Sequence, residues 1–224
     1  MLVSCWSAKG GSGATVVAAA LASVLSHRSD QGSLLVDAAG DLPLLLGLRE
    51  PDGPGLTEWV AAGPDVPADA LARLELPVRP GVRLLPRGNR VLDDPARVEV
   101  LAAVLAGDPR PVVVDVGLVT ARPGDGPAAE SARVLAVSAT QSLLVTRSCY
   151  LSLERAARLP MTPTGIVLLT ETGRAYDRRE FEDRIGAPVV GEVAVESQIA
   201  RAADSGSLAR RVPRALERGL RHAA

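Results

Sequence analysis

The residues best suited to chemistry form a glycine-rich stretch near the start of the chain, "SAKGGSGATV" from Ser7 to Val16. A glycine-rich turn between a strand and a helix can direct successive backbone N–H groups into one concavity, and the start of the helix adds partial positive charge. Both properties favour phosphate. The stretch therefore predicts a phosphate site in which Gly10, Gly11, Ser12 and Gly13 donate backbone hydrogen bonds.

Two positions in this stretch depart from the usual phosphate-loop pattern, G-x-x-x-x-G-K-[ST]. Within "AKGGSGAT", Gly13 and Thr15 match the pattern, but Ala8 replaces the first glycine and Ala14 replaces the lysine. Judged on the loop alone, a strand-to-helix turn without a ligand explains the sequence as well as a phosphate site does.

The basic residues single out one position in the loop. The chain has 25 basic residues, and all but Lys9 are arginine. An ammonium group is a compact point charge that fits a phosphate pocket where a planar guanidinium does not. The one lysine of the chain thus lies inside the glycine-rich stretch, where its ammonium group suits phosphate.

Two aspartates stand at the ends of apolar runs that predict buried strands. Asp37 closes "SLLVD", and Asp115 lies in "PVVVDVG". Taken singly, each is explained by a helix cap or by a turn at the end of the strand. Taken together, they lie at the carboxyl ends of two predicted strands, where open α/β sheets bind ligands.

The elements that must position these residues alternate along the chain. Near-continuous Val, Leu and Ile runs predict buried strands, and Ala- and Leu-rich stretches between them predict helices. The alternation indicates an α/β fold, a mostly parallel sheet with helices on both faces, in a single domain over residues 1–224. We expect strands at Leu2–Ala8, Ser33–Asp37, Gly81–Gly88 (with a turn), Pro111–Gly117, Ser142–Arg147, Gly165–Glu171 and Pro188–Val193, and helices at Ala14–His27, Leu56–Ala62 and Pro95–Gly107.

The composition limits the classes of protein to which this chain can belong. The 224 residues suit one large α/β domain, and hydrophobic residues at 47% with aromatics at 2% predict a core of Leu, Val and Ala. The net charge of -1 gives no whole-molecule attraction to nucleic acid or to an anionic membrane. No apolar run is long enough to span a bilayer, and the start of the chain lacks the pattern of a signal peptide. We therefore expect a cytoplasmic protein.

Several stretches resemble the MinD/ParA family of P-loop ATPases. "KGGSGAT" is similar to the family's deviant loop, which usually reads KGGxGKT. The stretches at 34–48, 112–117 and 188–213 are similar to its second motif, its Walker B strand, and its closing strand, loop and helix. The resemblance runs from residue 2 to about residue 211. It implies a P-loop NTPase-like fold, ATP and Mg²⁺ as cofactors, and a nucleotide-dependent homodimer.

The resemblance also implies a role for each candidate residue. The loop from Gly10 to Ala14 would cradle phosphates, while Thr15 and Asp115 would hold Mg²⁺. Asp37 would lie near the attacking water. Lys9 would reach phosphate, in the family often across a dimer interface. Lys9 and Asp37 are thus the candidate catalytic residues.

Departures from the family pattern point towards binding rather than fast hydrolysis. Ala14 removes a charge that would stabilise the transferring phosphoryl group. Ala39 stands where the second motif often has another aspartate, and Thr170 and Glu171 stand where an asparagine often contacts the base. The loss of the loop lysine together with "GDLPLLLGL" is most similar to the CpaE/TadZ branch, which with its septum-site-determining-like relatives helps to position pilus or secretion assemblies and influences poles and septa.

The resulting prediction is an ATP-binding positioning or assembly factor with weak or absent ATPase activity. Its expected partners are a second copy of the chain and proteins of a pilus, secretion or division machine, with recruitment to the pole, septum or inner membrane face. Two alternatives stay open: a partition ATPase that carries DNA, and a scaffold that binds no nucleotide.

The C-terminal segment is basic. Residues 201–224 contain six arginines against Asp204 and Glu217, a charge of +6 - 2 = +4. The sequence predicts a short basic helix at about 212–222. Its apolar face is small, so we expect a solvated helix rather than a membrane anchor, and only weak or indirect membrane association. The near-neutral chain also argues against nucleic acid as a partner.

Overall fold

The computed structural model describes residues 1–122 and 124–223. In this part of the chain, the eight strands join one sheet in the order β3-β4-β2-β5-β1-β6-β7-β8, with β3 antiparallel to β4 and the other pairs parallel. The predicted α/β fold class is therefore confirmed. The strands are β1 (Leu2–Ser7), β2 (Ser33–Asp37), β3 (Leu76–Arg79), β4 (Val82–Leu85), β5 (Val112–Leu118), β6 (Gln141–Arg147), β7 (Gly165–Thr170) and β8 (Val189–Ala194).

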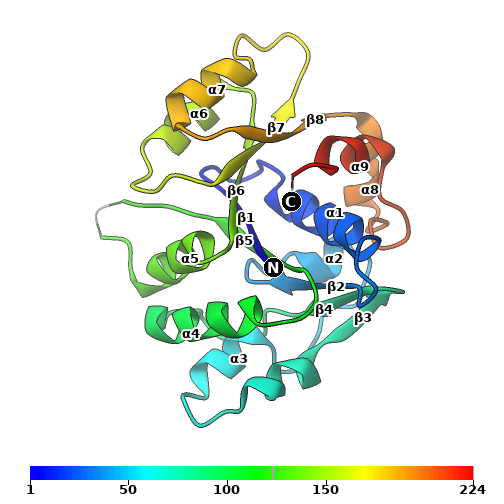
Figure 1. Cartoon of the computed structure of the whole chain (residues 1–224), viewed down its shortest axis with the longest axis vertical. Helices are drawn as coiled ribbons and strands as arrows, with labels where there is room; N and C mark the ends of the chain where they lie inside the picture. Colours follow the sequence, from blue (N-terminus) through cyan, green and yellow to red (C-terminus); the bar gives the residue numbers. More distant parts are fainter. Residues whose placement is uncertain (123, 224) are drawn as a thin grey trace.

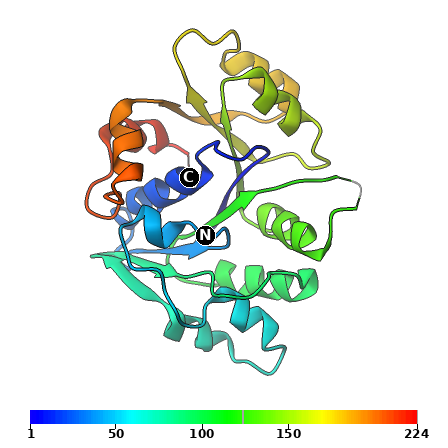
Figure 2. The same ribbon diagram turned by 180° about the vertical axis from the view of Figure 1, so that it is seen from behind.

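Helices cover both faces of the sheet. One face carries α3 (Leu56–Ala61), α4 (Pro95–Ala106), α5 (Pro127–Val137), α6 (Tyr150–Ala157) and α7 (Arg178–Ile185). The other face carries α1 (Ala14–Ser26), α2 (Leu42–Leu45), α8 (Ser197–Asp204) and α9 (Arg214–Leu220). Figure 1 shows α4 to α6 on the left of the sheet and α1, α8 and α9 on the right, and Figure 2 shows the same division from behind.

The alternation of side chains along the central strand explains the two layers. In β1, Leu2 and Trp6 join the hydrophobic cluster on the α4 side, whereas Val3 and Cys5 join the cluster on the α1 side. Successive side chains of a strand point to opposite faces, so a strand that is apolar throughout must be buried on both. This explains why the central strands are largely apolar on both faces, whereas the edge strand β8 alternates buried and exposed residues.

The segment between β2 and β4 contains structure that the sequence did not indicate. A short helix, α2, follows β2, and β3 adds an antiparallel strand at the edge of the sheet. A 3-10 helix at Ala68–Leu74 leads into β3. These elements are short, and two of them contain proline, so local periodicity gave no clear signal for them.

The expectation that the C-terminal helix is simply solvated is wrong. Val212, Leu216 and Leu220 are buried, and α9 contacts β8 and α1. Apolar side chains four residues apart share one helix face, so even this small apolar face can dock on the sheet. Gly219 allows the close approach, since a Cβ there would lie 2.3 Å from the backbone oxygen of Glu192.

No helix in the described part of the chain is long and apolar enough to span a bilayer.

Candidate functional site

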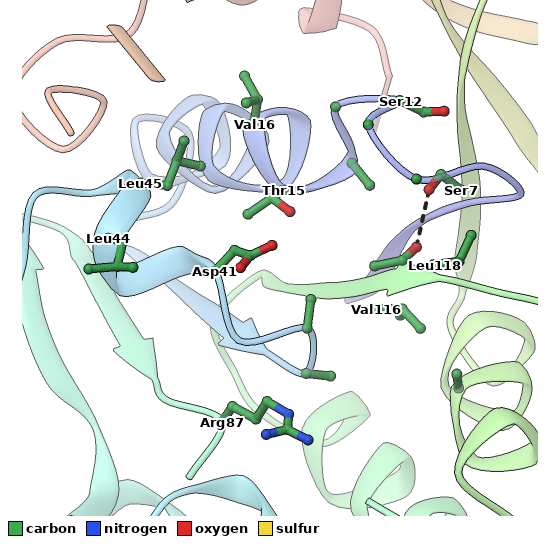
Figure 3. A pocket seen from close by; sticks show the side chains of 18 of the residues that line it. Ser7, Ser12, Thr15, Val16, Asp41, Leu44, Leu45, Arg87, Val116 and Leu118 are labelled. Atoms are coloured by element: carbon green, nitrogen blue, oxygen red, sulfur yellow. Dashed lines mark hydrogen bonds between the residues drawn. The ribbon is translucent and has the colours of Figure 1, made fainter. Parts of the chain in front are cut away.

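A pocket of about 1040 Å³ opens at the carboxyl edge of the sheet. Its walls come from the loops after β1, β2 and β5, from the start of α1 and from the end of α8 (Figure 3). Open α/β sheets bind ligands at this edge because loops from several strands converge there. The glycine stretch from Gly10 to Thr15 lines the pocket throughout.

The geometry of the glycine stretch leaves its N–H groups available to a ligand. Gly11 and Gly13 have φ angles of 75° and 89°, in the left-handed region that favours glycine. The Ser12 hydroxyl donates to the backbone oxygen of Lys9 at 2.7 Å and closes the turn. No side chain caps α1, which begins at Ala14 directly after Gly13. The free N–H groups of its first turn therefore suit an anion.

The two predicted aspartates are neighbours beneath this pocket. Asp37 and Asp115 are paired in register on the adjacent parallel strands β2 and β5, and both are fully buried. Each uses one oxygen to accept a backbone N–H that follows it: Asp37 in the turn after β2, and Asp115 within β5, which runs three residues beyond it to Leu118 and so does not end at Asp115 as the sequence suggested. The N–H of Gly40 donates to Oδ1 of Asp37 at 2.6 Å, and the N–H of Gly117 donates to Oδ1 of Asp115 at 3.2 Å. The Oδ2 atom of each has no hydrogen-bond partner among the described residues.

The electrostatics of the pair favour a cation. The pKa of Asp115 is raised to about 7: burial is the main cause and the charge of Asp37 adds to it, while the Thr15 side chain and the N–H of Gly117 lower it. Burial also raises the pKa of Asp37 to about 6. Two buried carboxylates with unpaired oxygens are costly when both are charged. A divalent cation next to Thr15 would supply the missing partner.

Lys9 lies outside the lining of the pocket in its own protomer. Its Nζ donates to the backbone oxygen of Gly10 at 3.4 Å. The pKa of Glu171 is lowered mainly by its hydrogen bond with Arg174, and the charge of Lys9 adds to this. Lys9 therefore lies towards the end of β7, and the structure does not bring it together with Asp37 and Asp115.

The structure adds charged residues that the sequence reasoning missed. Asp41, Arg87, Arg147 and Asp204 all line the pocket. Figure 3 shows Asp41 and Arg87 around the same hollow as Thr15. Arg87 forms no ion pair among the described residues, and its charge partly offsets the raised pKa of Asp37. The available signal was position, because Arg87 lies in the turn that ends the stretch predicted at Gly81–Gly88, as Asp37 ends its own predicted strand.

Arg147 belongs to an ion-pair chain at the pocket edge. It pairs with Glu171 at 3.0 Å, and Glu171 also pairs with Arg174. Glu171 occupies the place where the resemblance would put a base-contacting asparagine. Its carboxylate is held by two arginines, which leaves adenine recognition by this residue without support.

The arrangement as a whole matches solved structures of nucleotide-binding proteins. A ParA family ATPase from Chlorobium tepidum TLS is 21% identical, with a TM-score of 0.76, over 98% of this chain and 95% of that chain. The cell division ATPase MinD of Pyrococcus furiosus is 20% identical, with a TM-score of 0.73, over 100% of this chain and 99% of that one. The fold is that of the MinD/ParA ATPases.

A third MinD/ParA structure was solved with a ligand. The septum site-determining protein MinD of Pyrococcus horikoshii, complexed with Mg-ADP, is 20% identical, with a TM-score of 0.70, over 93% of this chain and 86% of that chain. No protein-family model and no curated protein sequence matches the chain. The resemblance found in the sequence thus agrees with the MinD/ParA fold, while the CpaE/TadZ branch stays a prediction.

Proposed function

We propose that the chain is an ATP- and Mg²⁺-binding positioning or assembly factor with weak or absent ATPase activity. The observation that carries the proposal is the pair Asp37 and Asp115. Each keeps one buried oxygen without a partner among the described residues, beneath a glycine loop that leads into a helix with no side-chain cap. A bound phosphate would accept hydrogen bonds from the loop, and a divalent cation beside the two aspartates would bind their unpaired oxygens.

Each residue has a defined task in this proposal. The backbone from Gly10 to Ala14 binds phosphate oxygens, and Thr15 with Asp115 holds Mg²⁺. Asp37 lies next to Asp115 in the adjacent strand, where its carboxylate orients water. The bound Mg²⁺ supplies positive charge at the phosphates.

Hydrolysis is expected to be slow. Ala14 lines the pocket where the usual lysine would reach phosphate, and Ala39 lines it where the family often has a second aspartate. Losing one positioned electrostatic group costs a reaction roughly 10²–10³-fold in rate. The pocket thus has the groups expected to bind nucleotide and lacks two groups that would accelerate its hydrolysis.

Equilibrium binding of a fluorescent ATP analogue tests the proposal. The wild-type chain should bind with Mg²⁺ and much more weakly with EDTA, and Asp115→Asn should lower the Mg²⁺-dependent affinity by about 100-fold. Asp94→Asn is the matched control, because Asp94 caps α4 without lining the pocket and asparagine caps a helix equally well. No binding by the wild type at millimolar nucleotide would leave the nucleotide-free scaffold as the better account.

A second copy of the chain is the proposed partner at the pocket mouth. Leu44, Val91 and Leu118 line the pocket and stay 59%, 59% and 49% exposed. Apolar side chains gathered at the rim of a site favour burial against another protein. Lys9, which lies outside its own pocket, would then reach the phosphates of the partner subunit.

Light scattering with and without Mg-ATP measures this association. The wild type should dimerise with nucleotide, and Lys9→Ala should weaken the dimer while Lys9→Arg keeps the charge and part of the effect. If Leu118→Ser abolishes dimerisation and Lys9→Ala leaves it unchanged, the apolar rim forms the dimer contact and Lys9 has no part in it.

The resemblance to the CpaE/TadZ branch is the basis for proposing which cellular machine the protein serves. Pilus or secretion assembly, or septum placement, fits that resemblance, with recruitment from the cytoplasm to a pole, a septum or the inner membrane face. The buried apolar face of α9 supports protein-mediated rather than direct recruitment, since Leu216 and Leu220 are fully buried. Localisation of a fluorescent fusion of Asp115→Asn, compared with the wild type, tests whether nucleotide is required.

A further inference from the structure

A second pocket, of about 880 Å³, shares helix α8 with the first. Ala203 and Asp204 of α8 line the nucleotide pocket, whereas Arg201 and Ala202 line this one. Its other walls are the loop after α8 and the helix α9. We call it the arginine pocket, because its lining includes Arg201, Arg211, Arg214 and Arg218.

The positive charge of the arginine pocket is not compensated within the described chain. None of its four guanidinium groups forms an ion pair with a described residue, and Arg201 donates only to the backbone oxygen and hydroxyl of Ser197. Glu196 is the one acidic side chain in the lining. By contrast, Arg110 is held by both Glu75 and Asp108.

The arrangement brings like charges together, and a bound anion would offset their repulsion. Arg214 and Arg218 are four residues apart on α9, and like charges at this spacing repel on a helix surface. Arg201 and Arg211 add charge to the same hollow. The docking of α9 on β8 and α1 holds the helix in place, so the four guanidinium groups are gathered at the cost of mutual repulsion.

We propose that the arginine pocket docks an acidic segment of a partner protein. Guanidinium groups bind carboxylates through two parallel hydrogen bonds, so four arginines suit several Asp or Glu side chains. Ala202, Pro213 and Ala215 add apolar surface for the aliphatic parts of such side chains.

The distribution of charge favours a short acidic segment over duplex DNA. Residues 201–224 carry +4, so the rest of the chain carries -1 - 4 = -5. A duplex has about one negative charge per 1.7 Å along its length. Its phosphates would extend beyond the four arginines of the pocket, and the rest of the chain carries a net negative charge that does not attract them. A peptide can confine its charge to the hollow.

Fluorescence anisotropy with a labelled oligoglutamate peptide tests the proposal on the full chain without nucleotide, so the result does not depend on nucleotide binding. The wild type should bind at low salt, and Arg214→Ala/Arg218→Ala should weaken binding at least about 10-fold. The control Arg90→Ala/Arg155→Ala removes the same charge from exposed positions elsewhere and should change affinity less than about twofold. The affinity of Arg214→Lys/Arg218→Lys should fall between those of the wild type and the alanine variant, because lysine keeps the charge but cannot form the two parallel hydrogen bonds of a guanidinium group.

Three results would overturn the proposal. The wild type fails to bind the peptide, or the control variant loses as much affinity as the pocket variant. Alternatively, a DNA duplex or vesicles containing an anionic lipid, compared at the same salt concentration, bind more tightly than the peptide and depend on Arg214 and Arg218. Circular dichroism of each variant shows whether the helices remain folded. If the alanine variant is not folded, the lysine variant is compared with the wild type in its place.

Discussion

The two pockets that share α8 are built in different ways. The nucleotide pocket lies over strand ends, and its acidic groups, Asp37 and Asp115, are fully buried in the register of the sheet. The arginine pocket lies between short helices, and its charged groups are carried on exposed positions of α8, α9 and the loop between them. A site at strand ends is fixed by backbone pairing, whereas a site between helices depends on how well their apolar faces dock.

The largest expected effect concerns the missing lysine. Ala14→Lys places an ammonium group at the start of α1, in the lining of the nucleotide pocket. Steady-state phosphate release should rise by up to roughly 100-fold, because the charge stabilises the transferring phosphoryl group. Peptide binding at the arginine pocket should not change.

Ala14→Met is the matched control for that prediction, since methionine adds length without charge and should leave the rate low. Wild-type turnover within the roughly 1–100 s⁻¹ of active kinases would contradict the proposal that Ala14 handicaps the chemistry. Assays across protein concentrations also report whether Lys9 acts only between two copies.

The docking of α9 should be the next most sensitive feature. In Gly219→Ala the added Cβ would lie 2.3 Å from the backbone oxygen of Glu192 and 2.7 Å from Val193. Overpacking of this kind costs about 1–3 kcal/mol, which outweighs the roughly 1 kcal/mol that alanine gains in a helix. The melting temperature should fall by several degrees, and peptide binding should weaken.

Gly53→Ala provides the comparison, because nothing lies within 4 Å of a Cβ at that position. It should leave the melting temperature within about a degree. Equal destabilisation by the two substitutions would mean that α9 does not need the close approach at Gly219.

The stability of the two regions should also differ in pH dependence. The pKa of Asp37 is raised to about 6 and that of Asp115 to about 7, so between about pH 4 and 7 the folded chain holds protons that the unfolded chain releases. Unfolding free energy from this pair therefore falls as the pH rises through that window. Without nucleotide or Mg²⁺, Asp115→Asn should show a shallower fall in melting temperature between about pH 5 and 8.

Arg214→Ala/Arg218→Ala removes neither of these carboxyl groups, so this variant should keep the wild-type pH dependence. Asp94→Asn serves as a second control for removing a carboxylate. An unchanged slope in Asp115→Asn would place its carboxyl group in a more polar environment than its burial indicates.

The smallest expected effect belongs to Arg87. Its side chain lines the nucleotide pocket without an ion-pair partner among the described residues, and its stem packs against Gly40. Arg87→Ala should lower nucleotide affinity by about 5-fold, roughly 1 kcal/mol, as expected for a partly exposed charge contact. Arg90→Ala, three residues further on and exposed, should have no measurable effect in the same titration.

Much of the fold could be predicted because its strands are apolar on both faces. The predicted strand at Ser33–Asp37 matches β2, and that at Gly165–Glu171 differs from β7 by one residue. Edge strand β3 and helix α2 were missed, because four-residue elements give too little periodicity to recognise. The glycine loop could be recognised in the sequence because Gly11 and Gly13 adopt positive φ angles that favour glycine.

The sequence by itself determined the alternation of strands and helices, the glycine loop, and the two aspartates at strand ends. Those features depend on local composition and backbone preference. The tertiary structure decided that Asp37 and Asp115 are neighbours, that Lys9 does not line its own pocket, and that Arg87 does. It also gathered Arg201 and Arg218 around one hollow by docking α9 on the sheet. These distances depend on contacts between residues far apart in the chain, which no local pattern encodes.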